Sequence, residues 1–322
     1  MILSLQTHRA PADTWFPVLA SSDLEPGAVL PVTVDSVRVA VWRSVAGDVS
    51  AWGDRCPHRG MRLSFGAVRG ETLLCPYHGW TFDKTAQCTH MPAHPEIAPS
   101  KAACAHAFAV AERGAYIWVN LAGSTVARPP VVTATKVKAV RTLYVPLTTE
   151  ATLAALLNFP LHDGASCTAA ALPQLERQNN SADERLVFNG TYSDGASFVA
   201  AIGANAVDGA YSLDMKATGA SGDVQYGVFV FPTTPGYSGV HVYTDLKDKL
   251  ATATATGLDS KIDSGLAFRL NAGVVALRNG LSDDYTPERY SDALDAISAW
   301  RKTLHEPDIQ RADDLEKMKC TK

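Results

Sequence analysis

The chain has 322 residues, of which 46% are hydrophobic and 19% charged, and this balance is that of a folded globular protein. Its net charge of −4 argues against nucleic acid or an anionic membrane surface as a partner. No apolar run reaches the length of a membrane span, and the start MILSLQTHRA lacks the apolar core of a signal peptide, so we expect a cytoplasmic protein.

The sequence of residues 1–125 predicts short β-strands joined by turns. Residues 29–44 and 115–123 are rich in β-branched and aromatic side chains and are bounded by Gly, Pro and Asp. The stretch STVARPPVVTATK, residues 124–136, is typical of a linker or of the first strand of a new domain. Because the chain is too long for one ordinary core, we expect two domains, at residues 1–125 and 126–322.

The second part of the chain predicts an antiparallel sheet with helices. Residues 151–164 begin as a helix that ends at Pro160 and Gly164. Strand-like segments with turns at Asp-Gly and Pro-Gly follow at residues 185–193, 197–203, 211–219, 224–232 and 239–246. Two helices are predicted at residues 258–280 and 286–306, and the second begins with a Thr N-cap followed by Pro. The expected fold class is therefore α+β.

Two cysteines and two histidines lie close together at an unusual spacing. Cys56 and His58 are two positions apart, Cys75 and His78 are three apart, and sixteen residues separate the pairs. Zinc also accepts two thiolates and two imidazoles, but zinc fingers of that composition pair Cys with Cys and His with His along the chain. Mixed pairs suit a [2Fe–2S] cluster with both cysteines on one iron and both histidines on the other, each loop giving one ligand to each iron.

The other cysteines show no disulfide spacing. We expect them to be free thiols in core or surface positions: Cys88, Cys104, Cys167 and Cys320. His90 and His94 follow the second Cys/His pair closely, and we expect them to support its loop rather than bind metal.

The sequence Cys-x-His followed by Cys-x2-His resembles the ligand motif of Rieske proteins. Pro57, Arg59 and Gly60 in the first loop, and Gly79-Trp80 at the end of the second, are typical of that family as well. Three further segments resemble the α subunits of Rieske non-heme iron oxygenases, in particular O- and N-demethylases: WFPVLASSDLEPG, FDKTAQCTHMPAHP and AERGAYIWVNLAG.

This resemblance implies a fold and a set of cluster ligands. The fold is an N-terminal all-β Rieske domain followed by a helix-grip domain, in which an antiparallel sheet packs against long helices. In the cluster, Cys56 and Cys75 would bind one iron as thiolates. His58 and His78 would bind the other iron through one ring nitrogen each, and their second nitrogens would carry a proton coupled to reduction.

Oxygenases of this family also need a mononuclear iron, bound by two histidines and a carboxylate in the second domain. The preferred match to their motif, with one residue deleted, places Asn158 and His162 at the histidine positions. It also places Ala155 at the acid that links one subunit's Rieske histidine to the next subunit's iron. Asn271 falls at the carboxylate position, and another register puts His162 first and Cys167 second. The resemblance thus implies a degenerate site with little affinity for Fe(II).

Three functions remain open. We favour a Rieske subunit with a vestigial oxygenase domain that gives electrons from its cluster to an intact Rieske oxygenase α subunit in a hetero-trimer or hexamer. The alternative is an active monooxygenase that hydroxylates or demethylates a small molecule at an unusual iron site built from His162 with Asp163 or Cys167. The third is a non-catalytic redox or structural subunit. A flavin- or ferredoxin-type reductase would supply the electrons.

Overall fold

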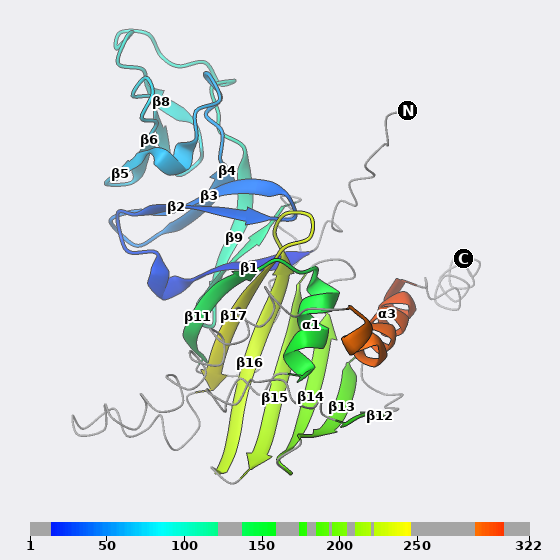
Figure 1. Cartoon of the computed structure of the whole chain (residues 1–322). Helices are drawn as coiled ribbons and strands as arrows, with labels where there is room; N and C mark the ends of the chain where they lie inside the picture. Colours follow the sequence, from blue (N-terminus) through cyan, green and yellow to red (C-terminus); the bar gives the residue numbers. More distant parts are fainter. Residues whose placement is uncertain are drawn as a thin grey trace, which may run out of the picture.

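The computed structural model describes residues 14–121, 137–158, 174–178, 185–192, 195–204, 210–219, 222–245 and 287–305. Residues 14–121 form two antiparallel sheets, with strand orders β1-β10-β9-β4-β3-β2 and β5-β6-β7-β8 (Figure 1). The strands are β1 (Trp15–Ala20), β2 (Val29–Val34), β3 (Val37–Arg43), β4 (Val49–Gly53), β5 (Ala67–Arg69), β6 (Thr72–Leu74), β7 (Thr81–Asp83), β8 (Cys88–His90), β9 (Ala107–Arg113) and β10 (Tyr116–Asn120). Two 3₁₀ turns complete this part, η1 (Ser21–Asp23) and η2 (Leu63–Phe65).

The second part is built on one antiparallel sheet of seven strands in the order β11-β17-β16-β15-β14-β13-β12. Its strands are β11 (Val137–Val145), β12 (Gln174–Gln178), β13 (Leu186–Thr191), β14 (Ser197–Ala204), β15 (Tyr211–Gly219), β16 (Gly222–Pro232) and β17 (Ser238–Asp245). The helix α1 (Thr149–Asn158), the turn η5 (Pro287–Tyr290) and the helix α3 (Ser291–His305) share one apolar core with this sheet. An ion pair between Arg301 and Glu150 joins the two helices.

The expected α+β fold is confirmed, with an all-β first part followed by an antiparallel sheet with helices. The five strand-like segments of the second part correspond to β13–β17, and the predicted C-terminal helix corresponds to η5 and α3. The sequence analysis did not identify β12, and it placed no strand at β11 itself. The domain boundary at 125/126 and the helix predicted at 258–280 lie outside the described residues, so both stay predictions. Among the described helices, none combines the length and apolarity needed to cross a bilayer.

Three strand glycines are explained by aromatic rings on the facing strand. In each case a methyl group added to the glycine would lie 2.1–2.2 Å from a ring carbon, far inside van der Waals contact. The directly paired residues are Gly190 and Phe198, Gly227 and Tyr243, and Gly239 and Phe231. The rings occupy the space of the missing side chains, and this packing compensates for the poor strand propensity of glycine.

The two parts meet where β1 and β10 pack against β16 and β17. Trp15, Tyr116 and Trp118 from the first part form one buried cluster with Phe229 and Tyr243 from the second. The Tyr116 and Trp118 rings lie edge-on to Phe229, with centroids 5.5 and 5.2 Å away. These edge-to-face contacts stabilise the interface beyond simple burial of apolar area.

The β2–β3 hairpin also contacts the large sheet. Asp35 and Ser36 form its two-residue turn with φ of 45° and 64°, the left-handed conformation that such hairpins require. Their backbone N–H groups donate to the carbonyl oxygens of Pro232 and Thr233 at 3.0 and 2.6 Å. The end of β16 therefore provides backbone acceptors for the tip of a hairpin from the other sheet.

A fully buried histidine lies at the same interface. His241 Nε2 lies 3.0 Å from the carbonyl oxygen of Pro17, and His241 Nδ1 lies 2.8 Å from the Thr142 hydroxyl. Because a carbonyl only accepts, Nε2 carries the proton and donates it, and Nδ1 accepts from Thr142. Burial lowers the pKa of His241 to about 3, opposed by the bond to Pro17, so the folded chain holds this ring neutral.

This histidine makes stability depend on pH. Its pKa is depressed in the folded state, so the unfolded chain takes up a proton first when the pH falls below the ordinary value of 6.5. Stability is therefore lost from about pH 6.5 downwards, by about 2 kcal/mol at pH 5 from this group alone. Urea unfolding at pH 7 and pH 5 measures the loss. The variant His241→Gln keeps a hydrogen-bond donor for Pro17 and does not titrate. Its free energy of unfolding should therefore fall by about 2 kcal/mol less than that of the wild type between pH 7 and pH 5. Equal losses in both proteins would contradict the prediction.

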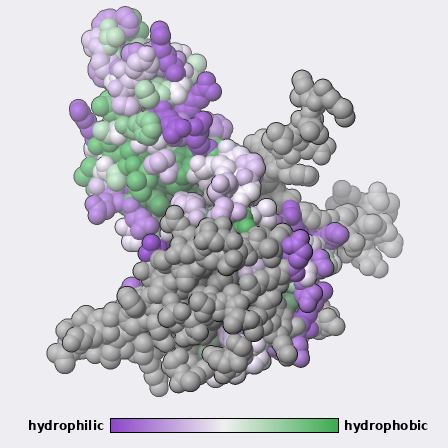
Figure 2. Space-filling view, in the orientation of Figure 1, coloured by the Kyte–Doolittle hydropathy of each residue, from purple (hydrophilic) through white to green (hydrophobic). Residues whose placement is uncertain are grey.

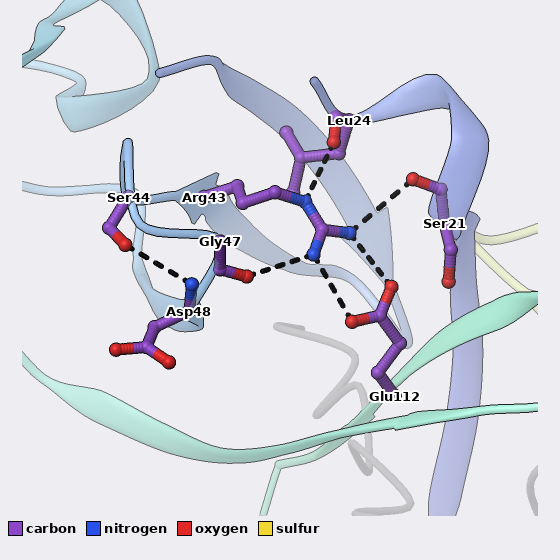
Figure 3. A network of polar contacts seen from close by, with 7 residues as sticks. All are labelled: Ser21, Leu24, Arg43, Ser44, Gly47, Asp48 and Glu112. Atoms are coloured by element: carbon purple, nitrogen blue, oxygen red, sulfur yellow. Dashed lines mark hydrogen bonds and ion pairs between the residues drawn. The ribbon is translucent and has the colours of Figure 1, made fainter. Parts of the chain in front are cut away.

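A nearly buried arginine joins four segments of the first part (Figure 3). Arg43 on β3 donates from Nε to the Leu24 carbonyl at 2.8 Å and from Nη1 to the Gly47 carbonyl at 3.0 Å. Arg43 also forms a bidentate ion pair with the carboxylate of Glu112 on β9, in which Nη2 and Nη1 donate to the two oxygens at 2.8 and 3.1 Å. These bonds lower the pKa of Glu112 against the opposing effect of its partial burial. The planar fork of arginine suits this site because lysine offers no matching geometry.

Candidate metal centre

Two loops of the same backbone conformation carry the four candidate cluster ligands. In each loop the cysteine N–H donates to the carbonyl five residues later, Cys56 to Met61 at 2.7 Å and Cys75 to Trp80 at 2.8 Å. In each loop a glycine four residues after the cysteine donates back to the cysteine carbonyl, at 2.8 and 3.1 Å. These glycines, Gly60 and Gly79, have φ of 73° and 71°. The different spacings Cys-x-His and Cys-x2-His therefore occur on loops of equal length.

The ligands pair by chemical type. Cys56 and Cys75 are buried, with 3% and 2% of their surface exposed, and the two thiols lie close enough to influence each other electrostatically. His58 and His78 are exposed, and their ring centroids lie 4.7 Å apart. In the part of the chain that the structure describes, no three His, Cys, Asp or Glu side chains are arranged to hold a single ion. Two inner thiols and two outer imidazoles are the donor set of a cluster in which each iron takes two protein ligands.

The raised pKa of Cys56 indicates that this thiol needs a positively charged group beside it in order to ionise. Burial raises the pKa of Cys56 to about 11, only partly offset by the backbone N–H of His58, and the neighbouring Cys75 raises it further. The Cys56 thiol therefore does not ionise near neutral pH without positive charge beside it. Iron ions would supply that charge, since a coordinating thiol is deprotonated. The residues present therefore fit a [2Fe–2S] cluster, with the cysteines on its inner side.

Aromatic rings hold the two imidazoles in place. The His58 ring stacks on Trp80 with centroids 4.3 Å apart and planes 2° from parallel. The Tyr77 ring lies 3.9 Å from that of His78 at an angle of 32°. Each imidazole therefore contacts a ring that comes from the second ligand loop, and its orientation is restricted before any metal binds.

A buried carboxylate, that of Asp54, joins the two ends of the first ligand loop. The sequence analysis did not identify this residue. Asp54 lies two residues before Cys56, and its two oxygens accept from the N–H and the hydroxyl of Ser64, each at 2.8 Å. Both residues are 7% exposed. Because Asp54 precedes the loop and Ser64 belongs to η2 behind it, this contact joins the two ends of the segment that carries Cys56 and His58. The sequence signal that could have identified Asp54 was the presence of an acidic residue two positions before the Cys-x-His motif.

The structure also places the other cysteines and histidines near the motif. Cys88 is buried in the same apolar cluster as Cys56 and Cys75, while Cys104 is exposed, and both are free. His90 and His94 are exposed. Cys167 and Cys320 lie outside the described residues. Burial raises the pKa of Cys88, so this thiol stays protonated.

The predicted mononuclear iron positions are only partly within the described residues. Asn158 is the last residue of α1, and its side-chain amide donates to the Ala154 carbonyl at 2.7 Å. Ala155 is completely buried in the core of the second part. His162 and Asn271, with the alternatives Asp163 and Cys167, lie outside the described residues. The degenerate site therefore stays a prediction.

Comparisons with known proteins separate a sequence likeness in the first part from a fold likeness over the whole chain. Residues 14–110 match the family described as the Rieske [2Fe-2S] domain. The chain is 41% identical over 115 residues to the oxidoreductase NdmD of Pseudomonas putida, covering 35% of this chain and 20% of that protein. It is 36% identical over 114 residues to the methylxanthine N1-demethylase NdmA of the same organism, covering 34% of this chain and 32% of NdmA. The sequence match thus spans a third or less of these relatives.

Solved structures resemble nearly the whole chain. Dicamba monooxygenase bound to dicamba superposes with a TM-score of 0.58 at 20% identity, covering 91% of this chain and 98% of that one. NdmA of Pseudomonas putida with caffeine superposes with a TM-score of 0.58 at 20% identity, covering 91% of each chain. At this identity the likeness shows the fold, which is that of Rieske oxygenases in both parts.

Proposed function

We propose that this chain, which carries a Rieske [2Fe-2S] domain at residues 14–110 and has the fold of Rieske oxygenases, is an electron-transfer subunit of such an oxygenase. The observation that carries the proposal is the pairing of buried Cys56 with Cys75 and of exposed His58 with His78 on two equivalent loops. A bound [2Fe–2S] cluster supplies one-electron oxidation and reduction, and histidine ligation sets its potential above that of an all-cysteine cluster.

The residues around the cluster site have distinct tasks in this function. The buried thiols would hold one iron of a bound cluster. The exposed imidazoles would hold the other iron through one ring nitrogen each, which would leave the second nitrogen of each ring free to carry a proton coupled to reduction. Trp80 and Tyr77 orient these rings. The imidazole edge is therefore where an electron enters or leaves the chain.

We further infer that the mononuclear iron site of this chain is vestigial. Asn158 and Asn271 offer neutral amides where the family has an imidazole and a carboxylate, and such ligands bind Fe(II) weakly. The amide of Asn158 already donates to the Ala154 carbonyl, and Ala155 lies in an apolar core where an unpaired carboxylate would be costly. A chain of this kind would give its electrons to an intact Rieske oxygenase α subunit in a hetero-oligomer.

The alternative is an active monooxygenase. The fold likeness to dicamba monooxygenase and NdmA over 91% of this chain favours it, because both structures were solved with a small molecule bound. This function requires an iron site formed by His162 with ligands other than Asn158 and Asn271. The third candidate, a redox or structural subunit without a catalytic partner, predicts the same cluster but no association with an intact α subunit.

Metal analysis of the purified chain tests these candidates. We expect two irons and two sulfides per chain, and an EPR signal after dithionite reduction with the low average g value of histidine-ligated clusters. Three irons with substrate turnover by the chain alone would favour the active enzyme. His78→Cys should retain the cluster and lower its midpoint potential, because a thiolate adds negative charge. An unchanged potential would contradict the assignment of His78 as a ligand.

A matched pair of substitutions tests the vestigial site. Asn158→His together with Asn271→Asp restores the two lost ligand types, and we expect the restored chain to bind a third iron when Fe(II) is added anaerobically. Asn189→His with Gln225→Glu adds an imidazole and a carboxylate on strands β13 and β16, at positions that the motif does not include, and should not add iron. A third iron in the unaltered chain would overturn the vestigial assignment and leave the cluster assignment intact.

A further inference from the structure

The buried carboxylate of Asp54 is bonded to neutral groups and not to a cation. One oxygen accepts from the Ser64 N–H and the other from the Ser64 hydroxyl, so neither oxygen carries a proton. Among the ion pairs that join described residues, none includes Asp54. Two neutral donors therefore satisfy the hydrogen bonds of this carboxylate but do not cancel its negative charge.

This charge is held close to the thiol ligands. Asp54 precedes Cys56 by two residues, so their Cα atoms are at most about 7 Å apart. Its partner Ser64 directly follows Leu63, which is fully buried in the same apolar cluster as Cys56 and Cys75. Water is largely excluded from such surroundings, so the charge acts there with little screening.

The positive charges of the same loop face water instead. Arg55, Arg59 and Arg62 are exposed. Arg55 and Arg59 line a hollow of about 330 Å³ together with His58 and His106. Figure 2 shows many hydrophilic residues on this projecting end of the first part, where β5, β6 and β8 lie in Figure 1. Water and salt screen exposed charges, so the arginines offset the buried negative charge only weakly.

A buried negative charge beside an iron–sulfur cluster disfavours the addition of an electron. The potential of such a cluster depends on its net charge, on hydrogen bonds and on exposure to solvent. Ligation by His58 and His78 replaces two thiolates by neutral rings and raises the potential. The carboxylate of Asp54 acts in the opposite direction, from the side of the cysteines.

We propose that Asp54 lowers the midpoint potential of the bound cluster through its buried charge, and that Ser64 moderates this effect by donating to the carboxylate. The inference rests on the proposed function, because it requires a cluster held by the two ligand loops. Asp54 is a tuning residue and not a ligand. A lower potential makes the reduced cluster a stronger reductant, so its electron passes more readily to an acceptor.

Asp54→Asn tests the proposal by removing the charge while keeping the shape of the side chain. The amide oxygen still accepts from the Ser64 N–H, and the amide nitrogen donates to the Ser64 hydroxyl, which can also accept. In an EPR-monitored titration with dithionite, each cluster takes up one electron from the dithionite. At a fixed ambient potential the ratio of reduced to oxidised cluster should be about tenfold higher in the variant, a rise of about 59 mV in the midpoint. An unchanged midpoint with the EPR signal intact would overturn the proposal.

Ser64→Ala gives the opposite expectation and separates an effect of charge from an effect of structural support. It removes one donor but keeps the carboxylate, so the negative charge is less offset and the ratio of reduced to oxidised cluster should fall about twofold. Loss of structural support would shift both variants in the same direction, and that result would contradict the proposal. If Asp54→Asn assembles no cluster, Ser64→Ala decides alone: a lower midpoint supports the proposal, and an unchanged or higher one overturns it.

Asp83→Asn is the matched control for the loss of a carboxylate. Asp83 also accepts backbone and hydroxyl hydrogen bonds, from Thr85 and Gln87, but it is half-buried in a turn that faces water. Removal of this screened charge should change the midpoint much less than Asp54→Asn does. An equal rise in both variants would show that burial of Asp54 has no special effect. A wild-type chain without the EPR signal would refute the proposed function itself, whereas the midpoints of cluster-loaded variants bear on Asp54 alone.

Discussion

Gly79→Ala is expected to lose most of its iron–sulfur cluster. Gly79 has φ of 71°, and an alanine methyl group there would lie 2.8 Å from Cγ of Pro92. The left-handed conformation costs about 1–2 kcal/mol for alanine, and the overlap with the stiff proline ring adds to it. Both effects act on the residue that directly follows His78 and whose N–H bonds to the Cys75 carbonyl. The second ligand loop would therefore move, and iron and sulfide per chain would fall.

Gly70→Ala separates the cost of the left-handed backbone conformation from the cost of steric overlap. Gly70 also has a positive φ, of 59°, but a methyl group there would meet nothing within 4 Å. It lies in the turn between β5 and β6, outside both ligand loops. We expect this variant to be slightly less stable and to keep its full cluster content. Equal cluster content in Gly79→Ala and Gly70→Ala would show that the shape of the second loop is not limiting for assembly.

Arg43→Met is expected to destabilise the first part by about 3 kcal/mol, because it removes a nearly buried cation that satisfies several carbonyl groups and one carboxylate. The Arg43 side chain is 11% exposed, so water cannot easily replace its bonds to Leu24, Gly47 and Glu112 (Figure 3). The methionine keeps most of the apolar volume, so the effect isolates the lost polar contacts. Urea denaturation at neutral pH measures the change in the free energy of unfolding.

Lys84→Met provides the control for this effect. Lys84 also makes two ion pairs, with Asp48 at 2.8 Å and Glu71 at 3.5 Å, but its side chain is 52% exposed. Exposed ion pairs contribute little because water screens them and the side chains lose freedom on pairing. We expect this variant to unfold at nearly the wild-type urea concentration. A similar loss in both variants would mean that burial does not decide the contribution of Arg43.

The presence of a Rieske domain was predictable because its signal is local. Cys56, His58, Cys75 and His78 lie within 23 consecutive residues, and the chemistry of a mixed donor set narrows the choice of metal group. The equivalence of the two loops was not predictable from the spacing, because His58 and His78 occupy different positions relative to their cysteines. Gly60 and Gly79 were noted as family-typical, but their common left-handed backbone conformation is a property of the folded loops.

The sequence predicted that the second part contains an antiparallel sheet, but it did not predict all of the strands. Alternating apolar residues identified the strands β13–β17 because one side of the sheet faces the apolar core. The edge strands β11 and β12 were missed, and β11 contains Lys138 and Arg141 among its apolar residues. Edge strands often carry charged side chains that oppose pairing with other molecules, and such residues interrupt the apolar pattern. Their assignment depends on pairing with β17 and β13.

The sequence by itself determined the kind of cluster and the α+β fold, because both follow from short-range patterns of ligands and of apolar residues. Only the tertiary structure decided which side chains meet across long separations: Arg43 with Glu112, His241 with Pro17, and the arginines of the first loop with His106 around one hollow. Such contacts depend on how strands from distant parts of the chain pair and pack. No periodicity along the sequence records that arrangement, since each contact stabilises the fold only after the sheets have formed.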